Sequence, residues 1–146
     1  PMVEAEMRAL RERLWIKTDV GGCARYERDY FHQVEREKVD QVPGNPWIIC
    51  TLWHAQHAIA RAMSLSDLAQ ALPYMEWAAA RAFESGVLAE QFHPYTGQPI
   101  GVSPLTWSHA TFVMVVLEYL SKLQVLTRGA SRSSRAEVET EMSGLT

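Results

Sequence analysis

Proline and glycine residues divide this chain into segments whose apolar residues recur with helical spacing, and this division is the strongest constraint on its fold. Turn-forming residues cluster at 43–46, at Gly86 and at 94–104. Between these clusters, apolar residues recur every three or four positions, which is the period of a helix with one buried face. The expected helices cover residues 3–15, 46–63, 66–83 and 105–126. The sequence therefore predicts an all-α fold with almost no strand.

Residues at the ends of these segments support the predicted boundaries. Asn45 can cap the second helix, and Pro46 suits its first position because proline lacks an amide hydrogen that would be unpaired there. Ser66 is the expected cap of the next helix, which should kink or shift near Pro73 and end before Gly86. Two helices joined by a short connection form an antiparallel hairpin.

The length and charge of the chain limit its functions. A chain of 146 residues that is 47% hydrophobic fits one domain with a core. A net charge of -3 gives no basic surface, so neither nucleic acid nor an anionic membrane surface is an expected partner. The stretches 46–62 and 106–120 are interrupted by polar and charged side chains, and we expect them to be too polar to span a bilayer. Residues 1–13 do not form a secretory signal, so a cytoplasmic location is expected.

The spacing of cysteine and histidine residues does not indicate a metal site. Cys23 and Cys50 lie in different segments without the spacing of zinc ligands, and we interpret both as buried small hydrophobic residues. His54 and His57 are three residues apart and could share a helix face, but no third ligand follows at a recognisable spacing. We expect no metal and no cofactor.

Glu90 is the first candidate for chemistry because it lies in a predicted loop between two helices, near aromatic and hydroxyl residues. A glutamate held at the mouth between helices can act as a general base. The alternative is a solvated loop glutamate, and from this segment alone that is the more common outcome.

Four motifs taken together favour the catalytic interpretation. They are Gly21-Gly22-Cys23-Ala24-Arg25-Tyr26 followed by Asp29-Tyr30, Gly44-Asn45-Pro46-Trp47-Ile48-Ile49-Cys50-Thr51, Gly86-Val87-Leu88-Ala89-Glu90-Gln91, and Ser103-Pro104-Leu105-Thr106-Trp107-Ser108-His109. Their order and spacing resemble the consecutive motifs of family 15 glycoside hydrolases, which are the glucoamylases, glucodextranases and related trehalases. One such motif recurs by accident, whereas four in order are specific.

The resemblance implies that residues 1–126 are the C-terminal part of a catalytic domain with an (α/α)6 toroid. Such a toroid needs six helical hairpins, and this chain supplies roughly the last four or five helices. The expected fold is therefore a partial (α/α)6 toroid made of antiparallel helical hairpins. Residues 19–40 are expected to form a loop, and residues 127–146 a polar tail with a helix at 135–142.

The resemblance also implies hydrolysis with inversion, which uses two carboxyl groups ~6.5–9.5 Å apart. In the family, the general base is the glutamate of a Leu-x-Glu-Gln motif, and Glu90 matches it. The general acid of the family lies in an upstream motif that has no counterpart in this chain. General acid catalysis typically contributes ~10²–10⁴-fold in rate, so the isolated chain is expected to be inactive.

The family pattern assigns Arg25 to the innermost sugar subsite, where the fixed fork of a guanidinium can bind sugar hydroxyls. The alternative for Arg25 is a structural ion pair with Glu27, Asp29 or a more distant carboxylate, and the sequence leaves both open.

Trp47 and Trp107 resemble the aromatic residues of the pocket wall and floor, where an indole can stack on the apolar face of a sugar. Trp47 and Trp53 fall at different angles on the predicted helix, so at least one should be in the core, and Trp53 is the better core candidate. Trp77 is expected to pack in the core.

Two functional hypotheses follow from the sequence. The first is the C-terminal part of an inverting, exo-acting α-glucosidase that acts on α-glucan oligosaccharides or, as a trehalase-type member, on trehalose. The second is a non-catalytic helical remnant or a subunit that needs a partner chain. An incomplete toroid exposes apolar faces, so an upstream chain or self-association is expected to cover them.

Overall fold

The computed structural model describes residues 2–143, with side chains described for residues 2–129. Its helices are α1 (Met2–Leu14), α2 (Ile48–Arg61), α3 (Leu65–Ala69), α4 (Leu72–Ala79) and α5 (Thr106–Ser143). Its strands are β1 (Cys23–Ala24), β2 (Pro46–Trp47), β3 (Gln91–Phe92) and β4 (Pro99–Ile100). Among the described residues, the fold is helical with one small sheet, so the prediction of a helical chain is confirmed in its main part.

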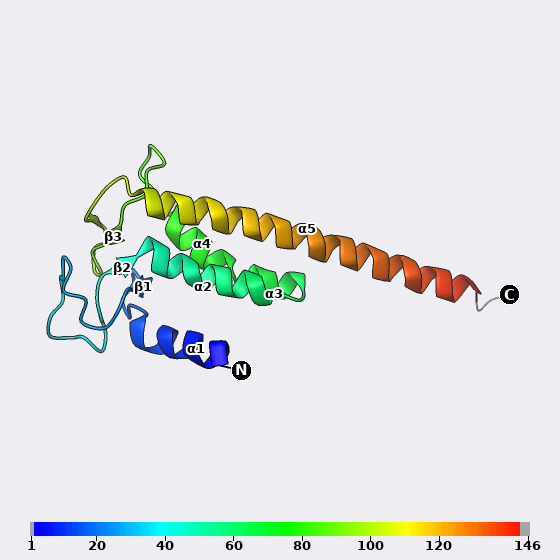
Figure 1. The fold of residues 1–146 in the computed structure, drawn as a ribbon, viewed down its shortest axis with the longest axis horizontal. Helices are drawn as coiled ribbons and strands as arrows, with labels where there is room; N and C mark the ends of the chain where they lie inside the picture. Colours follow the sequence, from blue (N-terminus) through cyan, green and yellow to red (C-terminus); the bar gives the residue numbers. More distant parts are fainter. Residues whose placement is uncertain (1, 144–146) are drawn as a thin grey trace.

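The helices lie side by side, and the strands and long loops gather at one end of them (Figure 1). Helices α2 and α5 begin at this end, whereas α1 and α4 run toward it. Successive long helices are therefore antiparallel, as the hairpin prediction requires. The connections at this end bring together the four motifs of the sequence analysis.

The sheet was not predicted from the sequence. Its four strands are antiparallel in the order β1-β2-β3-β4, and Trp47 lies opposite both Cys23 and Gln91. Two-residue strands show no alternating pattern, because alternation needs at least four residues to be recognised. The sheet links the loop of residues 19–40 to the loop that carries Glu90.

The predicted start of the second helix is wrong by two residues. Pro46 and Trp47 form β2, and α2 begins at Ile48 with Trp47 at the N-cap position. Asn45 does not cap this helix, because its side-chain amide is bonded to Gln91 and to the backbone of His32.

The predicted third helix is two helices, α3 and α4. Ser64, rather than Ser66, caps α3 by accepting a 3.1 Å hydrogen bond from the Asp67 amide. Pro73 lies in the first turn of α4, where a missing amide hydrogen costs little, so the predicted kink is a complete break. Helix α4 ends at Ala79, four residues before the expected end.

Helix α5 continues past its predicted end at residue 126 and through residues 135–142, where a separate helix was expected. Within it, Thr106–Gly129 is long and apolar enough to cross a membrane by length and composition, with a mean hydropathy of 1.3. The expectation that residues 106–120 are too polar for a span is wrong by this criterion, because the charges at Glu118 and Lys122 are flanked by apolar turns. One such helix is weak evidence for a span, and α5 contacts α2, α3 and α4.

Two hydrophobic clusters hold the helices and the sheet. The larger joins α2, α3, α4 and α5 to Leu88 and Phe92, and Trp77 packs against it as predicted. The smaller lies around β1 and the start of α2. Trp47 belongs to the smaller cluster and is only 3% exposed, whereas Trp53 is 46% exposed. The assignment of Trp53 to the core is therefore wrong, and Trp47 is the buried tryptophan of the two.

Candidate functional site

The four motifs meet where β2 and β3 pair, at the end of the molecule where α2 and α5 begin (Figure 1). Pairing of Trp47 with Gln91 places Glu90 beside the first residue of α2. The Ile48 amide donates to the Glu90 carbonyl at 3.4 Å, and the Glu90 amide donates to the Val102 carbonyl at 3.0 Å. The backbone on both sides of Glu90 is thus fixed, while its side chain is half-buried.

The start of α5 anchors the segment before Glu90. His109 accepts a 3.0 Å hydrogen bond from the Leu88 amide through Nε2, which therefore carries no proton. Ser108 donates to the Ala89 carbonyl at 2.9 Å from a fully buried position. These two hydrogen bonds attach the backbone just before Glu90 to the first turn of α5.

Gly101 lets the backbone approach the Glu90 carboxylate closely. It has a φ of 78°, and a Cβ atom placed on it would lie 2.3 Å from Oε2 of Glu90. A Cβ atom at this distance would force the Glu90 carboxylate to move, and the positive φ also favours glycine. The segment that enters α5 therefore forms one wall of the carboxylate site.

Arg25 forms the ion pair with Asp29 that the sequence analysis gave as an alternative. Its Nε and one terminal nitrogen each donate to Asp29 at 2.9 Å, and Asp29 is buried. These hydrogen bonds raise the pKa of Arg25. The guanidinium also lies 4.5 Å from the ring centre of Trp47, a distance typical of a cation–π contact. Arg25 and Trp47, two of the predicted sugar contacts, are thus brought together.

Trp107 lies on the first turn of α5. It is 55% exposed and forms an edge contact with Trp53, with ring centres 6.4 Å apart. An exposed indole pair has open faces on which a sugar can stack. Trp53 therefore belongs to this surface, which the sequence analysis did not recognise.

A hydrogen bond between side chains also links two loops at this end of the molecule. The Tyr95 hydroxyl donates to Glu35 at 2.5 Å, joining the loop before β2 to the loop between β3 and β4. This bond, with the backbone amides of Glu37 and Lys38, lowers the pKa of Glu35 from its ordinary 4.5 to about 2.

The two histidines have different neighbours, and both cysteines are buried. His54 stacks on Tyr74 and is 6% exposed, whereas His57 lies 3.7 Å from Glu4. In the described part of the chain, no three histidine, cysteine or acidic residues converge as metal ligands. Cys23 and Cys50 are both buried and unpaired with each other, and burial raises the pKa of both thiols.

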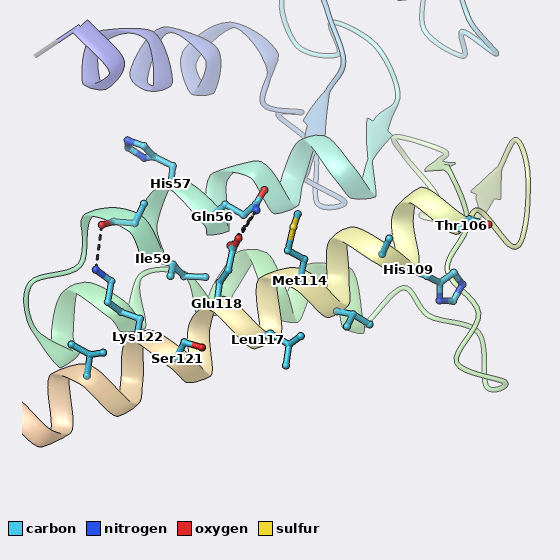
Figure 2. A pocket seen from close by; sticks show the side chains of 14 residues that line it. Gln56, His57, Ile59, Thr106, His109, Met114, Leu117, Glu118, Ser121 and Lys122 are labelled. Carbon is cyan, nitrogen blue, oxygen red and sulfur yellow. Dashed lines mark hydrogen bonds between the residues drawn. The ribbon is translucent and has the colours of Figure 1, made fainter.

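A large hollow in the described surface lies away from Glu90. It is a groove of about 1390 Å³ between α2 and α5 that starts near His109 and ends at Val125 (Figure 2). Two of its polar side chains are bonded within it, since Gln56 donates to Glu118 and Lys122 donates to the Ala60 carbonyl. The rest of the lining is mostly apolar, as expected for a face that packs on other helices rather than one that binds a sugar.

Sequence reasoning missed the residues that hold Glu90. Asn45 was predicted to be a helix cap. Gln91 and Ser108 were named as members of the motifs, but no contact was predicted for them. A polar residue that is fully buried usually has a specific hydrogen-bond partner, but burial is not visible in a single sequence.

The family model described as Glycosyl hydrolases family 15 matches residues 9–117, which is most of the chain. The chain belongs to glycoside hydrolase family 15. The resemblance seen in the four motifs is thus confirmed, and all four lie within the matched residues.

A glycosyl hydrolase relative and a solved structure agree with this assignment. The chain is 31% identical over 112 residues to an uncharacterized glycosyl hydrolase of Methanocaldococcus jannaschii, an alignment that covers 70% of the chain. It also superposes, over 84% of its length, on the crystal structure of a bacterial glucoamylase complexed with acarbose, with a TM-score of 0.66 and 23% identity. At this identity the superposition shows the fold.

The matched regions are small parts of the larger proteins. The chain spans 16% of the length of the Methanocaldococcus jannaschii protein and 18% of the bacterial glucoamylase chain. The activity of a whole family 15 enzyme therefore belongs to a larger molecule than the segment described here.

Proposed function

We propose that this chain is the C-terminal part of the catalytic domain of an inverting, exo-acting glycoside hydrolase, and that Glu90 is its general base. The observation that carries the proposal is the placement of Glu90, whose backbone is held at the junction of β2, β3 and α5 and whose side chain is half-exposed. A general base must be held in place and reachable by water, so this placement supports the proposed role.

Arg25, Trp47 and Trp107 are proposed to shape the innermost sugar site. Arg25 is held by Asp29 and stacked on Trp47, so its remaining donors are oriented before a substrate arrives. The bacterial glucoamylase with the same fold was crystallised with acarbose. By analogy, we propose an α-glucan oligosaccharide as the substrate, with trehalose as the alternative for a trehalase-type member.

The general acid is proposed to come from outside this chain. Among the motif residues, Asp29 has a buried carboxylate, but both of its oxygens accept hydrogen bonds from Arg25. It cannot protonate a leaving oxygen while it is held in this way. Inversion needs a second carboxyl group ~6.5–9.5 Å from the first, and an upstream part of the catalytic domain would supply it.

The groove between α2 and α5 supports a need for further chain. Exposed apolar side chains follow α5, including Val113, Leu117 and Val125. In a family 15 enzyme, such a face would pack against the remaining helices of an (α/α)6 toroid, of which this chain would be a part. A subunit that works only with a partner chain, or a non-catalytic remnant, would expose the same face.

Glucose release from maltotetraose and from trehalose tests the proposal. The chain is assayed alone and mixed with a family 15 catalytic domain that lacks the matching segment, for example that of the Methanocaldococcus jannaschii relative. Glu90→Gln keeps the shape of the side chain and removes the base. Glu84→Gln, on an exposed loop residue, is the matched control.

We expect release by the mixture only, with a loss of at least ~100-fold in Glu90→Gln and none in Glu84→Gln. Activity of the isolated chain would show that it contains an acid. A mixture that binds the chain but releases no glucose would favour the non-catalytic alternative, and full activity in Glu90→Gln would refute the assignment of the base.

A further inference from the structure

Two buried amide side chains, those of Gln91 and Asn45, connect the Glu90 carboxylate to the loop that contains His32. Gln91 and Asn45 are 0% and 1% exposed. The Asn45 amide nitrogen donates to the Gln91 side-chain oxygen at 2.9 Å and to the His32 carbonyl at 2.8 Å. The Gln91 amide nitrogen faces Oε2 of Glu90 at 3.4 Å, a long contact at the limit of a hydrogen bond.

The direction of this chain of hydrogen bonds is fixed at its far end. A backbone carbonyl can only accept, so the end of the Asn45 amide that faces His32 must be the NH2 group. The same nitrogen faces Gln91, and the facing atom of Gln91 must therefore be its oxygen. Gln91 is then forced to turn its own NH2 group toward Glu90, where a carboxylate can accept.

The fold holds both ends of this arrangement. Asn45 lies two residues before Trp47, and Trp47 pairs with Gln91, so Asn45 and Gln91 project from the same face of the sheet. His32 has a φ of 55°, an unfavourable backbone conformation for a residue other than glycine. Gly101 also lies close to Oε2 of Glu90, where a Cβ atom would be 2.3 Å from it.

We propose that Asn45 is a positioning residue that acts through Gln91 on Glu90. By holding the Gln91 amide in one orientation, Asn45 presents an N–H group to Oε2 of Glu90 and leaves Oε1 to take a proton from water. The catalytic meaning of this relay rests on the proposed role of Glu90 as the base. The relay itself, from His32 through Asn45 and Gln91 to Glu90, can be tested without hydrolysis.

Asn45→Asp is the informative substitution because it keeps the shape of the side chain and removes both donated hydrogens. Gln91 would then turn its NH2 group toward the new carboxylate and its oxygen toward Glu90. A purely structural role of Asn45 predicts lower stability, with no change in how Gln91 responds to the charge on Glu90.

The measurement is the pH dependence of the side-chain NH2 signals of Gln91 in ¹⁵N NMR spectra of the whole chain. The signals should move as Glu90 titrates, and the movement should disappear in Glu90→Gln and fall at least threefold in Asn45→Asp. Gln56 is an internal control, because its amide donates to Glu118 on another face and should respond equally in every variant.

Asn45→Ser is a second variant for the case that Asn45→Asp does not fold, because a hydroxyl can donate to only one of the two acceptors. We expect an intermediate movement of the Gln91 signals in Asn45→Ser. A wild-type Gln91 signal that does not respond to Glu90 would overturn the relay, as would an unchanged response in the folded Asn45 variants.

This experiment separates the relay from the proposed function. A coupled Gln91 signal without glucose release in any mixture would leave the relay standing and refute the hydrolase. Glucose release that depends on Glu90 without a coupled signal would refute the relay alone. Where the mixture is active, Asn45→Asp should lower kcat about 10-fold with KM within about twofold.

Discussion

Single residues around Glu90 carry the geometry of the candidate site, and glycine is the least replaceable of them. Gly101 and Gly86 have nearly the same φ, 78° and 80°. A Cβ on Gly101 would meet the Glu90 carboxylate, whereas a Cβ on Gly86 would meet nothing within 4 Å. The pair therefore separates the cost of backbone strain from the cost of the collision.

We expect Gly86→Ala to lower the free energy of unfolding by about 1 kcal/mol, which is the cost of a left-handed backbone with a side chain. Gly101→Ala should cost about 1–2 kcal/mol more, because Glu90 must also move. Chemical denaturation of both variants measures the difference. Adding Glu90→Ala to Gly101→Ala should remove the extra cost, and an extra cost that persists would show that Glu90 is not the obstacle.

His54 gives the structure a pH dependence at the residue scale. Burial, with the nearby charges of Arg11 and His57, lowers the pKa of His54 from its ordinary 6.5 to about 4. The unfolded chain takes up a proton near pH 6.5, while the folded chain does not, so this contribution to stability is complete above pH 6.5 and falls as the pH drops toward 4.

The expected loss between pH 6.5 and 4 is on the order of 1–3 kcal/mol. Thermal unfolding measured across this range checks it. His54→Phe keeps an aromatic ring against Tyr74 and cannot titrate, so its curve should be flatter in the same window. Parallel curves for the two proteins would assign the pH dependence to other groups.

At the scale of helices, the caps and breaks were harder to predict than the helices themselves. Ser64 and Ser66 are both good capping residues, and their hydroxyls lie 2.9 Å apart. Only Ser64 accepts from the Asp67 amide, and this contact begins α3. The sequence could not choose between two serines that are two positions apart.

We expect Ser64→Ala to cost about 1 kcal/mol of stability, because the cap of α3 is lost. Ser66→Ala, the matched control, should change the free energy of unfolding by less than about 0.5 kcal/mol. Urea denaturation of both variants distinguishes them. Equal costs would mean that the hydroxyl pair, rather than the cap, is what stabilises this turn.

The spacing of apolar residues predicted α1, α2 and α5, because each has a face of apolar residues that recur every three or four positions. The sheet and the relay behind Glu90 could not be predicted in the same way. Asn45 has good capping chemistry and sits before a proline, so local rules favour a helix start. Pairing with the distant Gln91 overrides that preference, and a single sequence does not show such long-range contacts.

The same limit explains the exchange of roles between Trp47 and Trp53. Their spacing shows that they point in different directions, but not which direction is inward. The inward side is set by the loop of residues 19–40, whose Arg25 covers the Trp47 ring. The resemblance singled out Glu90, Arg25 and Trp47, and the fold brings these three residues to one end of the molecule. Their roles in a sugar site stay predictions.

At the scale of the whole molecule, the face of α5 decides how the chain behaves in isolation. Val113, Met114, Leu117 and Leu120 are between 45% and 59% exposed along one helix. Exposed apolar patches of this kind favour association with a partner. In the absence of the proposed upstream helices, the groove between α2 and α5 is the surface through which copies of the chain should associate.

Leu117→Lys should therefore weaken self-association of the isolated chain. A buried leucine contributes about 1.5–3 kcal/mol, so its replacement by a charge should raise the dissociation constant at least ~10-fold. Met63→Lys is the control, because Met63 is 83% exposed at the end of α2 and outside the groove. Sedimentation velocity over a range of concentrations measures both variants. A monomeric wild-type chain, or equal weakening by the two substitutions, would show that the α5 face does not drive association, and the need for a partner chain would then rest on the missing acid alone.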